Sequence, residues 1–113
     1  MLFDLVSEGG ILRVVLHNHP VPPGYSVSEV SVNVRIDAGY PDAQIDMAYF
    51  HPDLALASGR PLGAISPDAF DARVWQRWSR HRTPTNPWRP GVDGLATHFA
   101  LVKEWLHKEA SKA

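Results

Sequence analysis

The chain of 113 residues contains no cysteine. Without thiols it can form no disulfide, no thiolate zinc site and no thioester of its own. It also has no run of eighteen apolar residues, so the sequence predicts no membrane-spanning helix. The first residues lack the basic and apolar regions of a signal peptide. We therefore expect a cytoplasmic protein.

Net charge is also nearly absent, at −1, which leaves nucleic-acid binding possible only through a local basic patch. Apolar residues make up 44% and charged residues 20%, a globular composition. We expect one domain over residues 1–113 with an ordered core of about 3–109. The six histidines show no metal-ligand spacing beyond His17 and His19, so we predict neither a metal site nor a cofactor.

Alternating apolar residues predict an antiparallel meander of four strands. The clearest strand is 28–36, where Val30, Val32, Val34 and Ile36 point to one side. Residues 3–7 and 11–17 flank a glycine pair that is typical of a hairpin turn. Residues 44–50 alternate again. Residues 51–71 show no sustained period, and 74–79 are either a short strand or an extended segment.

One amphipathic helix is predicted over residues 93–109. Leu95, Phe99, Val102 and Leu106 form an apolar stripe at helical spacing, and Asp93 suits the N-cap. This helix is the expected cover for one face of the sheet, giving an α+β fold.

The most unusual segment combines tryptophan with arginine between residues 73 and 89. Its five arginines are not interrupted by any acid between Asp71 and Asp93. Such a segment is either a structural centre, because large aromatic side chains bury the most area, or a recognition surface. As a recognition surface it could bind a protein, or it could bind single-stranded nucleic acid with the tryptophans as stacking platforms. The candidate binding residues are Trp75, Arg77, Trp78, Arg80, Trp88, Arg89, Asp93 and His98.

A hydroxyl nucleophile is a further hypothesis for the same segment. Ser79 and His81 stand two residues apart, so on a strand they would share a face, as a nucleophile and its base would. The alternative is that Ser79 binds the backbone and His81 caps or stacks. Ser58 and Ser66 are weaker candidates for the nucleophile.

Several motifs, taken together, resemble prokaryotic family E of the ubiquitin-conjugating-enzyme-like superfamily. The resemblance runs from about Val21 to Leu106. It rests on Pro-Pro-Gly-Tyr at 22–25, on Gly-Tyr-Pro-Asp-Ala at 39–43, on the tryptophan-rich motif at 75–81 and on Trp-Arg-Pro-Gly at 88–91. It implies a conjugating-enzyme core trimmed of its usual N-terminal helix. The positions that match the superfamily are Tyr40, Pro41, His51, Pro52 and Asp53.

The resemblance fails at the reactive centre. Conjugating enzymes carry a His-Pro-Asn tripeptide and, about ten residues later, a catalytic cysteine. This chain has Asp53 in place of the asparagine and no cysteine in the following segment, which reads Gly59-Arg60-Pro61-Leu62-Gly63. An ionised Asp53 only accepts hydrogen bonds and would repel a developing oxyanion. Thioester transfer is therefore excluded.

The resemblance implies partners from a bacterial conjugation operon. These are a ubiquitin-like protein, an adenylating activating enzyme of the ThiF type and a JAB-type metalloprotease. Two hypotheses follow for this chain: a hydroxyl-based acyl carrier that uses Ser79 with His81, or a non-covalent adaptor. The outside alternative is a small nucleic-acid or protein-binding module.

Overall fold

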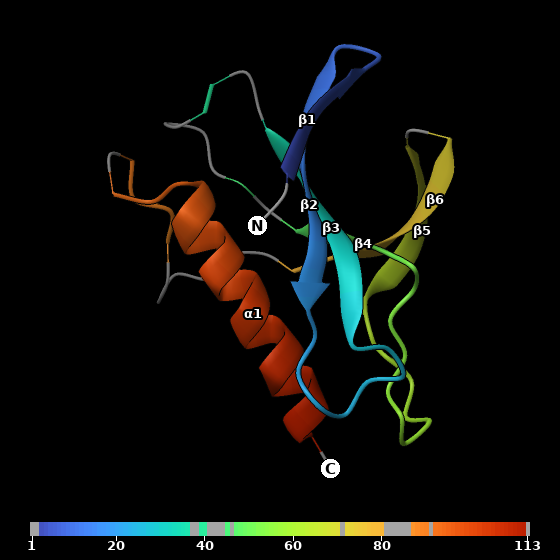
Figure 1. Cartoon of the computed structure of the whole chain (residues 1–113). Coiled ribbons are helices and arrows are strands. Elements are labelled where there is room, and N and C mark those ends of the chain that lie inside the picture. The colour runs from blue at the N-terminus through green and yellow to red at the C-terminus, as the bar shows by residue number, and fades with distance from the viewer. Residues whose placement is uncertain are drawn as a thin grey trace.

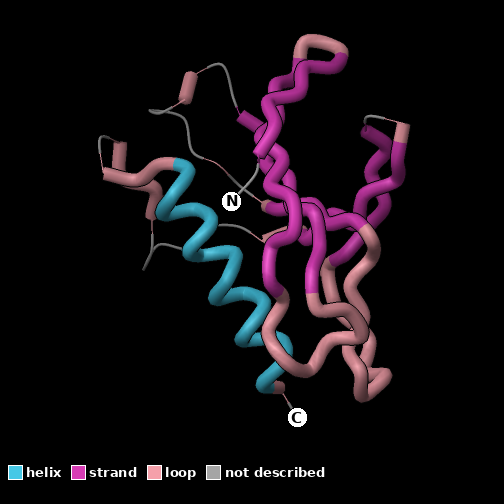
Figure 2. The backbone as a smooth tube through the Cα atoms, in the orientation of Figure 1, coloured by secondary structure: helices cyan, strands magenta, loops and turns pink. Residues whose placement is uncertain are grey.

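The computed structural model describes residues 3–36, 39–40, 45, 47–70, 72–80, 87–90 and 92–112. Within these ranges six antiparallel strands form one sheet, and one helix lies across one face of the sheet (Figures 1 and 2). The elements are β1 (Phe3–Glu8), β2 (Ile11–Pro20), β3 (Glu29–Ile36), β4 (Ala48–His51), β5 (Ile65–Phe70), β6 (Arg73–Trp78) and α1 (Leu95–Ser111).

The sheet corrects the prediction of four strands. Its order is β1-β2-β3-β4-β6-β5. After β4 the chain first forms the edge strand β5, and then turns back to form β6 between β4 and β5. β1 to β4 correspond to the four predicted strands, although β4 begins only at Ala48. β5 was not predicted because Pro67 lies in its middle and proline is unusual in strands. Proline is tolerated there because β5 is an edge strand.

The hairpin of β1 and β2 forms as its glycines predict. Gly9 and Gly10 have φ values of 59° and 79°, and they join the paired residues Glu8 and Ile11. Two successive positive φ values are typical of the type I′ turn, whose twist matches that of the strands. In Figure 1 this hairpin extends past the end of the helix.

The main core lies between α1 and the sheet. Val102 and Leu106 are fully buried against Val32, Phe50 and Trp78. Leu95 and Phe99 lie in a second cluster with Val14, Val34 and Ile45. The predicted helical stripe is therefore confirmed. The helix begins at Leu95 rather than Asp93, and its N-cap is Gly94.

A smaller core on the opposite face is built around a buried arginine. The Arg13 guanidinium lies 4.6 Å from the Tyr49 ring centre and 4.2 Å from that of Phe70. It pairs with Asp68 of β5 at 3.0 Å and donates a hydrogen bond to Asn33 Oδ1 at 3.2 Å. Because Arg13 belongs to β2, these contacts hold the β5–β6 hairpin against the middle of the sheet.

Removing this guanidinium should destabilise the fold. We expect Arg13→Ala to lower the free energy of unfolding by about 2–4 kcal/mol, because Asp68 loses its partner and two aromatic rings lose their cation. Urea denaturation measures this change. Arg35→Ala is the matched control: Arg35 is paired with Arg13 across the strands but is exposed, so its loss should cost less than about 0.5 kcal/mol. Equal effects of the two variants would contradict the role assigned to Arg13.

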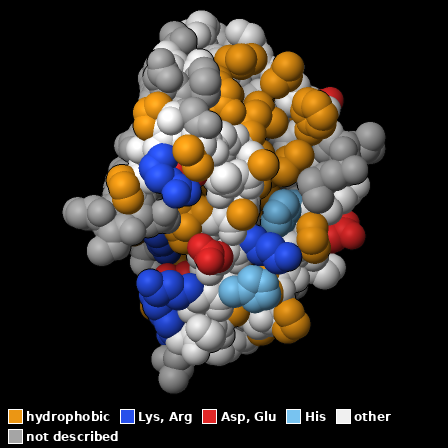
Figure 3. All heavy atoms as spheres, turned by 90° about the vertical axis from the view of Figure 1, so that its left-hand side faces the viewer, with side chains coloured by type: hydrophobic (Ala, Val, Ile, Leu, Met, Phe, Trp, Pro, Cys, Tyr) orange, Lys and Arg blue, Asp and Glu red, His pale blue; other side chains and the backbone are white. Residues whose placement is uncertain are grey.

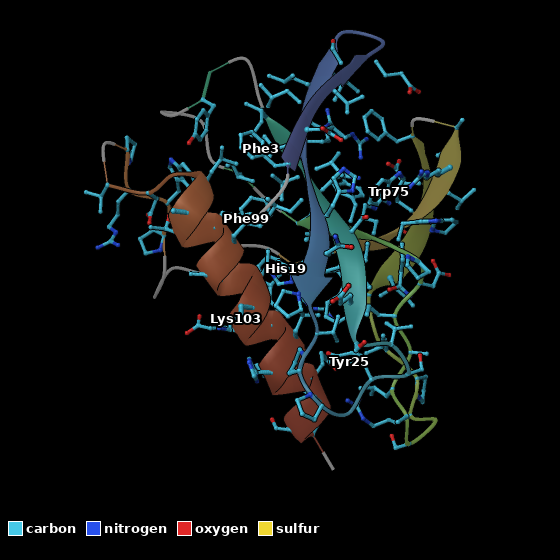
Figure 4. The ribbon with its side chains drawn as sticks, viewed as in Figure 1. Phe3, His19, Tyr25, Trp75, Phe99 and Lys103 are labelled. Atoms are coloured by element: carbon cyan, nitrogen blue, oxygen red, sulfur yellow. The ribbon has the colours of Figure 1, made fainter. Side chains whose placement is uncertain are left out.

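Burial of a histidine predicts a dependence of stability on pH. Burial lowers the pKa of His19, and the charge of Lys103 lowers it further, against the raising effect of the hydrogen bond to Pro20 O. Figure 4 labels His19 at the end of β2 and Lys103 on α1. The folded protein therefore keeps this imidazole neutral at pH values where the unfolded chain is protonated.

The contribution of neutral His19 is complete above pH 6.5, the ordinary pKa, and is lost as the pH falls through the folded pKa. We expect the free energy of unfolding to decrease between pH 7.5 and 5.5, and to decrease less in His19→Gln. Urea denaturation at both pH values tests this. An unchanged pH dependence in the variant would show that His19 is not the group responsible.

Candidate functional site

The tryptophan-rich motif forms a structural centre of the fold. Of the two roles predicted for it, Trp75 and Trp78 therefore have the structural one and not that of a recognition surface. Trp75 is 2% exposed and Trp78 is fully buried. Trp75 donates a hydrogen bond to Phe70 O at 3.1 Å, and its place on β6 is labelled in Figure 4. Trp78 packs edge-on against Phe50 with ring centres 5.2 Å apart. With so little exposed surface, neither indole offers a platform on which a nucleic-acid base could stack.

Gln76, between the two tryptophans, ties the motif to the loop after β4. Its side-chain oxygen accepts hydrogen bonds from Leu54 N at 3.0 Å and from Trp78 Nε1 at 2.9 Å. Its side-chain nitrogen donates to Leu54 O at 3.0 Å. One carboxamide thus satisfies three polar groups and fixes the backbone directly after the His-Pro-Asp tripeptide.

The tripeptide is held on the β6 side of β4. His51 Nδ1 lies 3.3 Å from Val74 O, and the His51 ring centre is 5.7 Å from that of Trp75. The peptide bond between His51 and Pro52 is cis. Asp53 is exposed. This is the acceptor-only group expected from the sequence, in the tripeptide position where the superfamily has an amide donor.

The loop segment 59–63, where the resemblance would place a cysteine, is attached to the end of α1. The Arg60 guanidinium donates to Glu109 O at 2.7 Å and to Glu109 Oε2 at 3.3 Å. Arg80 pairs with Glu109 Oε1 at 3.4 Å, and Lys112 pairs with the same oxygen at 2.9 Å. Arg60 therefore bonds to a carbonyl at the helix C-terminus, which also accepts a hydrogen bond from Lys112 N, as well as to a carboxylate.

This cluster gathers three cations around one buried carboxylate. Burial raises the pKa of Glu109, but hydrogen bonds from Lys112 and Arg60, with the charges of Lys112 and Arg80, lower it below the ordinary value overall. Nearby, Tyr25 donates a hydrogen bond to Leu106 O at 2.7 Å, and burial with the charge of Glu109 raises the pKa of Tyr25 to about 12. Glu109 is thus ionised at neutral pH, and the cluster keeps a net positive charge.

Two adjoining hollows lie along the loop and the β5–β6 hairpin. One, of about 240 Å³, is lined by Asp53, Ile65, Ser66, Pro67, Val74, Trp75 and Gln76. The other, of about 290 Å³, is lined by Leu54, Ala55, Leu56, Gly59, Arg60, Pro61, Leu62 and Ile65. Both contain Ile65, which is 38% exposed. We call this pair of hollows the loop groove. Asp53 lines one hollow, Arg60 lines the other, and most of the lining residues of both are apolar.

Of the predicted serine–histidine pair, the structure describes only Ser79. Ser79 is half-buried, and its backbone N donates to Ala64 O at 2.9 Å, so it lies beside the residue that follows Gly63. His81 lies outside the described residues, so the pairing stays a prediction. Ser66, a weaker candidate, accepts a hydrogen bond from Arg77 Nε at 3.0 Å.

The remaining predicted site residues hold the start of α1. Asp93 is buried, and its carboxylate accepts hydrogen bonds from the backbone N and the Nε of Arg89 at 2.7 and 3.4 Å. Trp88 is half-buried with its ring centre 6.4 Å from that of Tyr40. The Tyr40 hydroxyl accepts a hydrogen bond from Leu95 N at 3.1 Å, which caps the helix. Pro41 lies outside the described residues.

His98, predicted as a binding residue, is fully buried in the structure. It lies 2.8 Å from Met47 O through Nε2, and packs edge-on against Trp105 at 5.6 Å. Arg77 and Arg80 remain half-buried at the surface. Among the described residues no three His, Asp or Glu side chains gather in a way that could hold a metal ion, and no helix could span a membrane.

Sequence reasoning did not single out Arg60, Gln76 or Glu109. The available signal for Gln76 was its place between two tryptophans on a strand, where a side chain on the buried face must satisfy its amide. Glu109 gave no such signal, because an acid near the end of a helix is ordinarily solvated.

Loss of the Gln76 carboxamide should destabilise the fold. We expect Gln76→Ala to lower the free energy of unfolding by about 2–4 kcal/mol, because Leu54 N, Leu54 O and Trp78 Nε1 lose their partner. Arg77→Ala, one residue along the strand, removes one half-buried hydrogen bond and should cost less than about 1 kcal/mol. Denaturation followed by tryptophan fluorescence measures both. Equal costs would refute the central role of the amide.

The comparisons with known proteins agree with these features. Residues 1–109 match the model of the family described as Prokaryotic E2 family E. Neither the search of curated proteins nor that of solved structures finds a match. The match covers the sheet and nearly all of α1. The chain therefore belongs to prokaryotic E2 family E.

Proposed function

We propose that the chain is a non-covalent adaptor that binds a ubiquitin-like protein and presents it to an adenylating activating enzyme. Membership of prokaryotic E2 family E supports a role in a ubiquitin-like protein conjugation pathway. The absence of cysteine excludes the thioester chemistry of conjugating enzymes. An adaptor would still bind the partner proteins of such a pathway, but it would not carry out thioester transfer.

The observation that carries this proposal is the state of the loop where the cysteine would stand. Arg60 occupies this segment and is bonded to the backbone and side chain of Glu109. The Arg60 side chain is 28% exposed, and that of Glu109 is 8% exposed. The loop is therefore held as a structural attachment to the helix and presents a cation in place of a nucleophile.

The loop groove supports binding of an extended peptide with a free C-terminal carboxylate. Its apolar walls suit short aliphatic side chains, and Arg60 with the net positive cluster behind it suits the carboxylate. Asp53, which lines the other hollow, suits a basic residue elsewhere in the peptide. This is the chemistry of a ubiquitin-like C-terminal tail. Trp88 and Arg89 then serve as contacts on the outer surface near α1. A JAB-type metalloprotease would belong to the same operon.

One observation favours a second candidate, the hydroxyl-based acyl carrier. The backbone of Ser79 is bonded to Ala64, so this serine lies at the end of the loop that replaces the cysteine segment. With His81 as its base, Ser79 could accept the tail as an oxyester. We prefer the adaptor because the cations of Arg60 and Arg80 would suffice to bind the intact C-terminal carboxylate of the tail. The acyl carrier needs a nucleophile and a base in addition.

Reconstitution tests the adaptor. The chain is mixed with the activating enzyme and ubiquitin-like protein of the same operon and with ATP, and its intact mass and binding are measured. We expect a stable complex with no added mass on the chain. Ile65→Glu should raise Kd at least about tenfold, because it places an acid in the middle of the loop groove. Removal of the last residues of the ubiquitin-like protein should weaken binding similarly.

Val92→Glu is the matched control, since Val92 is 62% exposed and lies outside the loop groove. Its Kd should not change. A hydroxylamine-sensitive adduct that disappears in Ser79→Ala would contradict the adaptor and establish the acyl carrier. No binding of the ubiquitin-like protein would refute both.

A further inference from the structure

The two edges of the sheet are protected to different degrees. β5 carries Pro67, which has no N–H to offer, and Asp68, which pairs with Arg13. β1, at the other edge, has neither proline nor lysine, the residues that most often block an edge. No strand among the described residues pairs with the outer side of β1. β1 therefore offers a pairing edge that β5 does not.

The outward backbone groups of β1 belong to exposed residues, two of which are apolar. The two-residue turn makes Glu8 and Ile11 a hydrogen-bonded pair, and pairs alternate along an antiparallel ladder. Val6 and Asp4 therefore direct their backbone groups to β2, whereas Phe3, Leu5 and Ser7 direct theirs outward. Phe3 is 60% exposed and Leu5 64% exposed. Phe3 and Leu5 thus combine outward backbone groups, which no described strand pairs, with exposed apolar side chains.

The apolar side chains continue across the hairpin. Ser7 is paired with Leu12, so Leu12, 38% exposed, shares the face of Phe3 and Leu5. Figure 3, which views the helix side of the molecule, shows hydrophobic side chains gathered on its upper part, where the hairpin extends past the helix. Phe3, Leu5 and Leu12 form the apolar patch of β1.

We propose that β1 is a homotypic edge, at which a second copy of this chain pairs antiparallel about a twofold axis through Leu5. In this register Leu5 faces Leu5 of the second copy, and Phe3 faces its Ser7. The outward N–H and C=O groups of these residues then bond to one another. The two apolar patches merge into one surface on the helix side, and two six-stranded sheets become continuous.

The charges of β1 select this register. Asp4 and Glu8 are its charged residues. With the axis at Leu5, Asp4 faces Val6 of the second copy, and no described acid faces another. With the axis at Val6, Asp4 would face Glu8 twice, which repels. Asp4 Oδ2 also lies 2.7 Å from His17 Nε2 of the same chain, so the Asp4 carboxylate already has a partner and needs no basic residue from another strand. This favours a second copy over a basic peptide.

Sedimentation of the full chain tests the proposal. We expect a monomer–dimer equilibrium in the micromolar range, and Leu5→Lys should raise the dimer Kd at least about tenfold because two lysines would meet on the axis. Val74→Lys is the matched control. Val74 is 58% exposed on β6, and β2, β3 and β4 lie between it and β1, so its substitution should leave the dimer Kd unchanged. A chain that stays monomeric at several hundred micromolar would overturn the proposal.

Single cysteines test the register, because the chain has none of its own. Facing residues in a hydrogen-bonded antiparallel pair have Cα atoms about 5.5 Å apart, which a disulfide spans. Under mild oxidation Leu5→Cys should form a covalent dimer at least about tenfold faster than Val74→Cys. Faster cross-linking of Val6→Cys would overturn the Leu5 register. A monomer whose binding to the ubiquitin-like protein is lost in Leu5→Lys would instead assign this edge to that partner.

Discussion

The arrangement of the candidate site depends on the carboxamide of Gln76. This group must be satisfied because it lies at the boundary between β6 and the core, and the partners that satisfy it are the backbone of Leu54 and the indole of Trp78. Leu54 follows the His-Pro-Asp tripeptide, so the same bonds that complete the core also fix the start of the long loop. The loop can therefore be irregular and still have one conformation, because its polar backbone is paired at a buried point.

At its far end the loop is fixed by charge rather than by an amide. Glu109 is buried with three cations around it: Arg60 from the loop, Arg80 from just after β6, and Lys112 from the end of the helix. A buried carboxylate is costly unless its hydrogen bonds are complete. Arg60 donates to one carboxylate oxygen and to the helix carbonyl, while Arg80 and Lys112 donate to the other oxygen. The loop is thus attached to the helix through a residue that has a structural role and no thiol.

The elements that could be predicted from the sequence are those with local periodicity. The alternation of Val30, Val32 and Val34 and the helical stripe of Val102 and Leu106 both report burial directly, and the structure confirms them. β5 could not be predicted, because it contains Pro67, which only an edge strand tolerates, and Asp68, which is partly buried only because it pairs with Arg13. Burial of Trp75 and Trp78 also depends on this hairpin. Without β5, a motif rich in arginine could be read equally as surface or core.

The location of the two candidate surfaces follows from the strand order. The loop groove lies along β5 and β6, and the apolar patch lies on β1, at the opposite edge of the sheet. Pairing through β1 would therefore leave both grooves open, at the two ends of one continuous sheet. Two binding sites held at a fixed separation can engage successive domains of a tandem ligand, so that the second contact is intramolecular and strengthens a weak first one. An adaptor without covalent chemistry relies on affinity alone to retain its partner, and for such a protein a twofold arrangement has a direct physical advantage.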